Sequence, residues 1–388
     1  MKKILLVGGG SGGHITPLLA IASEIKKLHR GYHVAVISEK LGVFNHLFDG
    51  AQDIDDLHLI NAGKFRRYYG RSFFKHFFDP KTFLLNLRDL FRFIVGIIES
   101  FWLLIHIRPD IIFIKGGYVG VPVGFIAKLM GIPYITHDSD AKPGLTNRLI
   151  GKRALLNAVG MPLKNYKYKE DKIVYVGVPI SDEFKENNLG LRSKKRKELD
   201  LTQHDFLLLI TGGSNGARRM DKMIHAILKH LMDKNPRLHI VHQVGKENED
   251  IYSDYPAHLH SRIRVASFLK PLSGFIAASD TVISRAGATA LSEIGAMEKP
   301  LIIIPNPYLT GGHQLKNAEL FSIDNSAIVV NEHSALENPK VLSAEIQKLI
   351  DSPSLRSKIS QKLYKKTKMN ASLKIAELLI NNANNRKK

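Results

Sequence analysis

The chain has 388 residues, which at about 150 residues per domain allows two domains and excludes a disulfide-bonded mini-protein. Its 56 lysines and arginines exceed its 36 aspartates and glutamates by 20, and this excess favours anionic partners such as phosphorylated substrates, anionic lipid or nucleic acid. With no cysteine, the chain has no disulfide bonds, no thiolate catalysis and no cysteine-ligated metal.

Short apolar runs recur along the chain, and most are followed by a glycine-containing turn and then by a helical pattern. This alternation is typical of β-α-β units with parallel sheets. The sequence therefore predicts an α/β protein with two Rossmann-like parallel-sheet domains. The expected strands are Ile4–Val7, Val34–Ile37, Ile111–Lys115, Tyr134–Thr136, Phe206–Thr211, His239–Val244, Thr281–Ser284 and Leu301–Pro305.

The domain boundary is expected near Pro179. Residues 1–179 then form the N-terminal domain, 180–364 the second domain, and 365–388 a C-terminal amphipathic helix with a polar tail. The charged stretch Arg192–Lys197 is interpreted as a linker or a surface helix. The apolar stretch Leu90–Ile107 is interrupted by Arg92, Glu99 and His106, so we expect no membrane-spanning segment there.

The first glycine turn satisfies G-x-G-x-x-G through Gly8, Gly10 and Gly13, with Glu39 placed like the acid that binds a dinucleotide ribose. His14 follows directly, and Pro17 is expected in the first turn of the helix. An imidazole beside the backbone N–H groups suits chemistry at a diphosphate better than hydride transfer. The alternatives are a dinucleotide site, or glycines that only let strand and helix pack closely.

Two further turns carry small residues after apolar strands, at Gly212–Ala217 and at Arg285–Ser292. Each turn directs backbone donors and the positive end of a helix towards a bound anion. Glu293, one helical turn after Thr289, is placed to accept hydrogen bonds from two ribose hydroxyls. Together with the polar loop Gly311–Gln314, these features predict a nucleotide-sugar site in the second domain.

In their order and spacing, these motifs resemble the MurG family of bacterial N-acetylglucosaminyltransferases, within the GT-B superfamily of two Rossmann-like domains facing across a cleft. The resemblance runs from Gly8 to about Glu319. It rests on Gly8–His14 with Pro17, Gly116–Val119 with Pro122, His137 with Gly144–Asn147, Gly212–Ser214 with Gly216–Arg218, His242 and Gln243 with Gly245 and Lys246, Arg285 with Gly287 and Ala288, Ser292–Ile294, and Gln314 with Asn317 and Ala318.

The resemblance implies an inverting, metal-independent transfer of GlcNAc from UDP-GlcNAc, with no cofactor. His14 is the expected catalytic base and Asp138 the second choice. The residues implied for UDP-GlcNAc are Ser11, Gly12, Gly13, Asp140, Gly213, Ser214, Leu269, Arg285, Gly287, Ala288, Thr289, Ala290, Leu291, Ser292, Glu293 and Gln314. Those implied for the acceptor diphosphate are Gly10, Ser11, Gly12, Gly13, Gly117 and Tyr118.

Two positions depart from the family pattern. The chain has His137-Asp138-Ser139-Asp140 where the family has His-Glu-Gln-Asn, and Ser181 where the family places an arginine, so that one cation is missing. Asp138 and Asp140 also spell D-x-D, a metal-binding motif of another glycosyltransferase fold. Because no histidine and aspartate cluster accompanies it, loop polarity or substrate contact is the preferred interpretation, and no metal is expected.

Basic residues interleaved with aromatic ones fill the segment from Lys64 to Arg92. This pattern is typical of an interfacial patch on anionic lipid or of a single-stranded nucleic-acid site. A core helix pair with a solvated basic face is the other alternative. The lipid interpretation fits a polyprenyl-diphosphate acceptor, which stays in the bilayer. The expected membrane patch is Lys64, Arg66, Arg67, Arg71, Phe73, Phe74, Lys75 and Phe77.

The resemblance thus implies the lipid I to lipid II step of peptidoglycan synthesis, in which the acceptor is undecaprenyl-diphosphate-linked MurNAc-pentapeptide. The expected location is the cytoplasm, at the inner face of the cell membrane, and no nucleic-acid partner is expected. Another GT-B transferase that makes a glycolipid or cell-surface polysaccharide is the first alternative. A dinucleotide-dependent oxidoreductase is a remote one.

Overall fold

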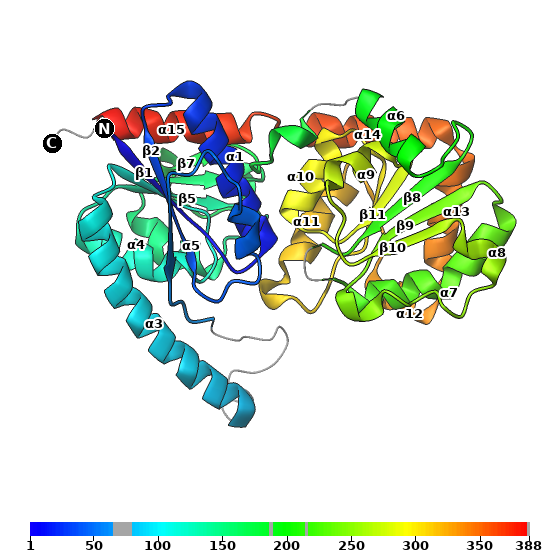
Figure 1. Ribbon diagram of the computed structural model, residues 1–388, viewed down its shortest axis with the longest axis horizontal. Coiled ribbons are helices and arrows are strands. Elements are labelled where there is room, and N and C mark those ends of the chain that lie inside the picture. The colour runs from blue at the N-terminus through cyan, green and yellow to red at the C-terminus, as the bar shows by residue number, and fades with distance from the viewer. Residues whose placement is uncertain (65–79, 186–188, 214–215, 386–388) are drawn as a thin grey trace. The chain divides into compact units, whose positions relative to one another are not determined.

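The computed structural model describes residues 1–64, 80–185, 189–213 and 216–385 (Figure 1). The chain folds into two compact units. The first comprises Met1–Ser181, Tyr308–His313 and Met369–Lys388, and the second comprises Asp182–Pro307 and Gln314–Lys368. Each unit is built on its own parallel sheet, so the expected pair of parallel-sheet domains is confirmed.

The first unit contains a seven-stranded sheet in the order β3-β2-β1-β4-β5-β6-β7, and every pair in it is parallel. The strand order reverses direction between β1 and β4, the position at which open α/β sheets bind ligands beyond the strands' carboxyl ends. The strands are β1 Lys3–Val7, β2 His33–Glu39, β3 Asp56–Ile60, β4 Ile111–Ile114, β5 Tyr134–Asp138, β6 Leu156–Val159 and β7 Ile173–Tyr175.

Helices cover both faces of this sheet. Along β1, Ile4 and Leu6 pack towards α1 and α15, whereas Leu5 and Val7 pack towards α3 and α4, as the two-residue period of a strand requires. Figure 1 shows α15 lying alongside α1, where its apolar side completes the core. The helices of this unit are α1 Gly12–Leu28, α3 Pro80–Ile107, α4 Gly120–Leu129, α5 Leu145–Ile150 and α15 Ala371–Asn385.

The second unit contains a six-stranded parallel sheet in the order β10-β9-β8-β11-β12-β13, which reverses between β8 and β11. Its strands are β8 Phe206–Thr211, β9 Leu238–Gln243, β10 Ile263–Ala266, β11 Thr281–Ser284, β12 Leu301–Ile303 and β13 Ile328–Val329. Its helices are α6 Leu189–Glu198, α7 Arg218–Lys234, α8 Ala257–His260, α9 Leu272–Ala278, α10 Ala288–Ala296, α11 His313–Ser322, α12 Glu332–Glu337, α13 Lys340–Asp351 and α14 Pro353–Lys366.

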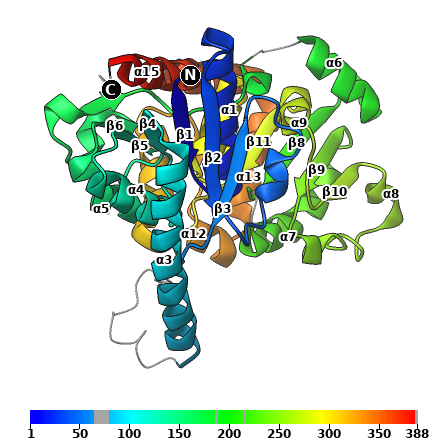
Figure 2. The same ribbon diagram turned by 60° about the vertical axis from the view of Figure 1, so that its left-hand side comes forward.

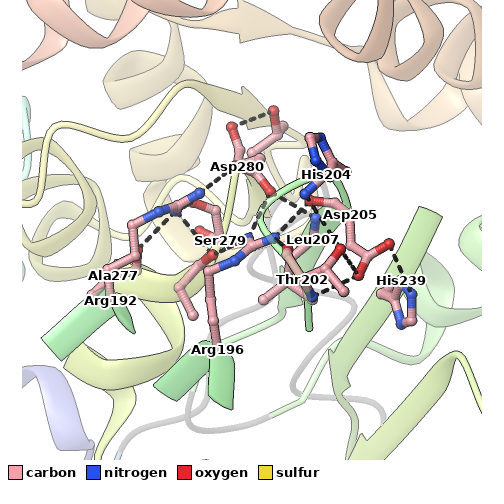
Figure 3. A network of polar contacts seen from close by, with 12 residues as sticks. Arg192, Arg196, Thr202, His204, Asp205, Leu207, His239, Ala277, Ser279 and Asp280 are labelled. Carbon is pink, nitrogen blue, oxygen red and sulfur yellow. Dashed lines mark hydrogen bonds and ion pairs between the residues drawn. The ribbon is translucent and has the colours of Figure 1, made fainter. Parts of the chain in front are cut away.

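The charged stretch at Arg192–Lys197 forms α6, a surface helix of the second unit (Figure 3). Arg192 donates hydrogen bonds to the carbonyls of Ala277, Ala278 and Ser279 at the end of α9, and it pairs with Asp280 at 2.6 Å. The buried guanidinium of Arg196 bonds the same aspartate and the carbonyls of Thr202 and Asp205. These two arginines therefore fix α6 against α9 and satisfy the carbonyls at the end of that helix.

One local expectation differs from the structure. Helix α1 begins at Gly12, so Pro17 lies in its second turn, inside the helix, rather than in the first turn. A proline at this position removes the hydrogen bond that its N–H would donate to the Gly13 carbonyl. The stretch Leu90–Ile107, with its charged residues, lies in the continuous helix α3.

Candidate functional site

The first glycine turn joins β1 to α1, and residues near the end of β2 hold it through hydrogen bonds. The Gly10 N–H donates to Glu39 Oε1 at 3.0 Å, and the Gly8 N–H donates to the Ile37 carbonyl. Gly10 has a φ of +87°, and a Cβ there would lie 2.7 Å from Cε1 of Tyr118, so only glycine fits. The Glu39 carboxylate thus holds this loop through Oε1, whereas its Oε2 is buried without a hydrogen-bond partner among the described residues.

The N-terminus of α1 carries no side-chain cap and no acidic residue in its first turn. Ser11, at the cap position, instead places its Oγ 2.9 Å from Nδ1 of His14. The backbone N–H groups of Gly12 and Gly13 therefore have no side-chain acceptor and face the carboxyl end of the sheet. Such a helix start favours a bound anion.

His14 is half-buried, and its ring lies against Gly117, whose Cβ position is 3.5 Å from Nδ1 of the imidazole. Burial and the positive charge of Lys115 lower the pKa of His14 to about 3, although a hydrogen bond with the Gly9 backbone opposes the shift. The imidazole is therefore neutral over the physiological pH range, which is the form that accepts a proton.

The loop after β4 meets the first glycine turn. Gly117 has a φ of +77°, and a Cβ there would lie 2.9 Å from the Gly9 carbonyl oxygen. Thr146 Oγ1 donates to the Gly117 carbonyl at 2.8 Å and ties this loop to α5. The structure therefore brings together Gly10, Ser11, Gly12, Gly13, His14, Gly117 and Tyr118 at the carboxyl ends of β1 and β4.

Asp138 closes β5 and is buried, with both carboxylate oxygens occupied. Oδ1 accepts from the Gly144 N–H and from Asn147 Nδ2, and Oδ2 accepts from the Tyr168 hydroxyl at 2.6 Å. Burial raises its pKa, against the effect of these donors. Asp138 thus fastens the turn to α5, and three of its roughly four lone-pair sites are taken by protein donors, which makes it a poor second choice of base. Asp140 lies in the same turn and is partly exposed.

The part of the chain that the structure describes contains no group of three histidine or acidic side chains placed to hold a metal ion. In the D-x-D sequence, the Asp138 carboxylate is consumed by protein donors, so the two aspartates do not form a pair of open oxygen ligands.

In the second unit, two turns lie at the carboxyl ends of the neighbouring strands β8 and β11. After β8, Gly213 has a φ of +80°, and its N–H donates to Thr211 Oγ1 at 3.3 Å. Ser214, expected to contact the donor, lies outside the described residues. Helix α7 then starts after Ala217 with no side-chain cap.

After β11, Gly287 precedes α10, which also has no side-chain cap and no acidic residue in its first turn. A Cβ at Gly287 would meet no atom within 4 Å, so the approach to this helix end is open. In the helix, Ala288 and Leu291 are buried, and Thr289, Ala290 and Ser292 are half-buried.

Glu293 lies one turn further along α10 and is buried. Burial, with a smaller contribution from the negative charge of Glu183, raises the pKa of Glu293 to about 8. Among the described residues, no hydrogen-bond donor satisfies this carboxyl group. An unsatisfied buried carboxyl beside an open helix end is consistent with a group that pairs with ligand hydroxyls.

Three of the residues expected to contact UDP-GlcNAc have structural contacts. Arg285 donates to the Ile304 carbonyl at 3.0 Å and forms a buried ion pair with Glu332. Gln314 Oε1 accepts from the Asn306 N–H at 2.8 Å, and Leu269 is buried before α9. These contacts support the loops after β11 and β12, and the role of Arg285 in donor binding stays a prediction.

Sequence reasoning missed Glu332 and Lys115. Glu332 begins α12 and pairs with Arg285 and with Arg219 at the start of α7, so one buried carboxylate joins the turns after β8 and β11. No motif marks it, since its partners are more than 45 positions away in the chain. Lys115 could have been noticed in the sequence, because it is a charged residue that directly follows the apolar run Ile111–Ile114.

Of the expected membrane patch, only Lys64 is described, and it is exposed. Arg66, Arg67, Arg71, Phe73, Phe74, Lys75 and Phe77 lie outside the described residues. Helix α3, which follows them, exposes large apolar side chains at three- and four-residue spacing along one face. They are Leu84, Leu87, Phe91, Ile94, Ile98, Phe101 and Trp102.

Within the described residues, the segment Leu84–Ile107 of α3 is long and apolar enough to cross a membrane by length and composition alone. Its second half nevertheless forms part of the cover of the first sheet, with Leu104 and Ile107 in the core. Glu99 accepts hydrogen bonds from the Asn61 backbone and pairs with Lys40. Figures 1 and 2 show the first half of the helix extending beyond the sheet.

Two family models match the chain. Residues 4–158 match the glycosyltransferase family 28 N-terminal domain, and residues 207–379 match the glycosyltransferase family 28 C-terminal domain. Together these matches cover most of both units.

Similar proteins share both sequence and length with the chain. A protein of Clostridium kluyveri is 33% identical over 350 residues, covering 90% of this chain and 91% of its own. One of Natranaerobius thermophilus is 31% identical, covering 88% and 89%. Both are named UDP-N-acetylglucosamine--N-acetylmuramyl-(pentapeptide) pyrophosphoryl-undecaprenol N-acetylglucosamine transferase.

Solved structures share the fold. The crystal structure of Acinetobacter baumannii MurG has a TM-score of 0.70 at 21% identity and covers 98% of this chain and all of its own. A Staphylococcus aureus MnaA–UDP structure has a TM-score of 0.69 at 14% identity, covering 100% and 99%. At these identities the likeness concerns the fold alone.

Proposed function

Because the chain belongs to glycosyltransferase family 28, we propose that it transfers GlcNAc from UDP-GlcNAc to undecaprenyl-diphosphate-linked MurNAc-pentapeptide, the lipid I to lipid II step of peptidoglycan synthesis. The observation that carries this proposal is the 33% identity, over 90% of the chain, to a relative named for that transfer. The geometry of each unit supports it.

The second unit binds the donor in this proposal. The backbone N–H groups at the start of α10 face an open approach, and they suit the diphosphate of UDP. Glu293 accepts hydrogen bonds from the ribose hydroxyls, which satisfies a carboxyl group that is otherwise buried without a donor. As the bond to the sugar breaks, the same helix end stabilises the negative charge that develops on UDP.

The first unit binds the acceptor diphosphate and supplies the base. The N–H groups of Gly12 and Gly13 at the start of α1 suit a second diphosphate. The C4 hydroxyl oxygen of the muramoyl sugar attacks the anomeric carbon, its proton passes to the neutral imidazole of His14, and UDP leaves with the bonding electrons. This single displacement inverts the anomeric configuration and requires no metal.

We infer that the protein works at the inner face of the cell membrane, where the acceptor's polyprenyl chain lies. Helix α3 supports this inference, because Phe91 is 69% and Trp102 64% exposed on its apolar face. Such a face inserts at the boundary between headgroups and acyl chains. Basic residues at Arg66, Arg67 and Arg71 add about 1 kcal/mol each near an anionic surface.

Ligand binding tests the donor half of the proposal. In calorimetry and thermal-shift measurements, we expect UDP and UDP-GlcNAc to bind and stabilise the protein, UDP-glucose to do so less, and NAD(H) and oligonucleotides not at all. Stabilisation by NAD(H) in place of UDP would overturn the assignment and restore the dinucleotide alternative.

A further inference from the structure

Lys115 is a buried lysine at the centre of the first unit's candidate site. It follows β4 directly, is 3% exposed, and its backbone N–H donates to the Val7 carbonyl at 2.9 Å. By the two-residue period of a strand, its side chain shares the face of Ile111 and Phe113, which pack towards α1. The ammonium group is therefore placed beneath the start of α1.

Gly8 lies between Lys115 and the first turn of α1, and its surroundings show that the two are close together. A Cβ on Gly8 would lie 2.8 Å from the carbonyl oxygen of His14 and 3.4 Å from Cβ of Lys115. Gly8 is thus enclosed between the two residues, and only the absence of a side chain allows this packing. Two residues after Lys115, Gly117 lies against the imidazole of His14.

A buried ammonium group is costly unless other groups compensate it. Lys115 Nζ donates to Ser139 Oγ at 2.6 Å, and the carboxylates of Asp138 and Asp140 act on it from the turn after β5. Burial lowers the pKa of Lys115 to about 8, although these two carboxylates oppose the shift. The lysine is therefore mostly charged at neutral pH.

The charges around His14 come from every neighbouring element. Lys115 at the end of β4 and the positive end of α1 both disfavour an imidazolium ion. Of the nearby carboxylates, Asp138 on β5 accepts three donors, and Glu39 on β2 accepts the Gly10 N–H through Oε1 only. Asp140 in the turn after β5 is the partly exposed carboxylate.

We propose that Lys115 is a positioning residue of the transfer reaction, which fixes the turn at Ser139 beneath the glycine loop and, together with burial, disfavours protonation of the His14 imidazole until an anionic acceptor binds. The bound diphosphate then offsets the ammonium charge and makes His14 a stronger base only when substrate is present. This inference rests on the proposed function, because it takes His14 as the base for the acceptor hydroxyl.

The test measures the titration of His14 directly, by NMR of the imidazole resonances, with His14→Gln used to assign them. In Lys115→Met, which removes the charge but keeps most of the side-chain length, we expect the His14 titration midpoint to rise by at least about half a pH unit. Lys115→Arg keeps the charge and is expected to leave the midpoint near the wild-type value. Adding inorganic pyrophosphate to the wild type is expected to raise the midpoint.

Activity gives the second readout. In Lys115→Met, the acidic limb of the kcat–pH profile should move to higher pH, in the same direction as the His14 titration. Lys115→Gln, which can still donate to Ser139 without a charge, replaces the methionine variant if that variant does not fold. It should show the same upward shift.

An unchanged His14 midpoint in a folded, uncharged Lys115 variant would overturn the inference. So would an equal rise in Lys115→Arg, because the effect would then follow from packing and not from charge. If wild-type enzyme shows no transfer at all, the proposed function fails, whereas the NMR titration still decides whether Lys115 controls His14.

Discussion

Glu293 shows how a single buried carboxyl group links stability to ligand binding. Its pKa is raised to about 8 in the folded protein, whereas an unfolded glutamate titrates near 4.5. As pH rises between these two values, the unfolded state ionises and the folded state does not. Folding is therefore penalised increasingly from about pH 4.5 to about pH 8.

We expect Glu293→Gln to increase the free energy of unfolding by a few kcal/mol at about pH 8 and by little at about pH 4.5, as measured by urea denaturation. The same variant should bind UDP more weakly by about 0.5–1.5 kcal/mol at neutral pH, the usual contribution of hydrogen bonds to a neutral group, because the Glu293 carboxyl group is then mostly protonated. Glu337→Gln, the same change at an exposed glutamate of the second unit that is not among the expected donor residues, is the matched control. UDP affinity that stays at the wild-type value would remove ribose recognition from Glu293.

At the same scale, His14→Ala is expected to lower kcat by about 10²–10⁴, because it removes the base that takes the acceptor proton. UDP affinity should remain nearly unchanged, since the turns expected to hold the ribose and diphosphate of UDP belong to the second unit. Steady-state kinetics and calorimetry measure the two effects separately. A variant that keeps most of its turnover would show that another group takes the proton.

Glycine turns were predictable from sequence because they leave a local pattern: Gly10 and Gly117 require a conformation or a close approach that only glycine allows. The hydrogen-bond and ion-pair partners of the side chains could not be predicted from the sequence. Whether Arg285 meets a ligand or Glu332 depends on a residue 47 positions away, and whether Asp138 is a base depends on Tyr168. Such pairings are set by tertiary packing and leave no local pattern.

At the scale of elements, α6 depends on one buried cation. Arg196→Met should destabilise the protein by about 1–3 kcal/mol in urea denaturation, because the carbonyls of Thr202 and Asp205 lose their donor, whereas Asp280 keeps Arg192 and the Leu207 N–H. Arg192→Met is the control with a smaller loss, about 1 kcal/mol, since its side chain is more exposed. Equal, small losses would show that α6 is held by its apolar contacts alone.

The apolar face of α3 is expected to carry membrane binding. Replacing Leu87, Phe91 and Ile98 with serine should reduce co-sedimentation with phosphatidylglycerol vesicles and turnover of a full-length lipid acceptor, yet preserve turnover of a soluble short-chain one. Ile323→Ser, an equally exposed apolar residue in the second unit, is the matched control. Equal loss on both acceptors would mean that the face belongs to the catalytic fold.

The basic residues before α3 give a complementary prediction that rests on sequence alone. Charge reversal at Arg66, Arg67 and Arg71 should weaken binding to anionic vesicles, and about 0.5 M salt should weaken the wild type in the same way, because it shortens the Debye length to roughly 4 Å. Binding that is indifferent to both changes would place the docking surface elsewhere.

The strands that the sequence predicted are the apolar ones, and all eight occur. It did not predict β3, β6, β7, β10 or β13, which are short or polar. β3 is an edge strand whose Asp56 and His58 interrupt the apolar pattern, and β13 has two residues. A strand of this kind is defined by its neighbour's hydrogen bonds, so its own residues carry little signal.

At the scale of the whole molecule, the two parallel sheets followed from the alternation of strands and helices. The packing of the C-terminal helix α15 against the first unit could not be predicted from that alternation. Its amphipathic pattern states that Ile375 and Leu379 are buried, but not that α1 and the first sheet are the surface that buries them. Sequence periodicity identifies the apolar face of a helix. The surface against which that face packs depends on the path of the chain through the second unit.

The measurement that tests the account most directly is turnover of UDP-GlcNAc with a short-chain analogue of lipid I, in the presence of a metal chelator. We expect that for each UDP released, one GlcNAc is joined to the C4 hydroxyl of the muramoyl sugar, with inverted anomeric configuration. Release of UDP by hydrolysis alone, or donor binding without any transfer to this acceptor, would contradict it.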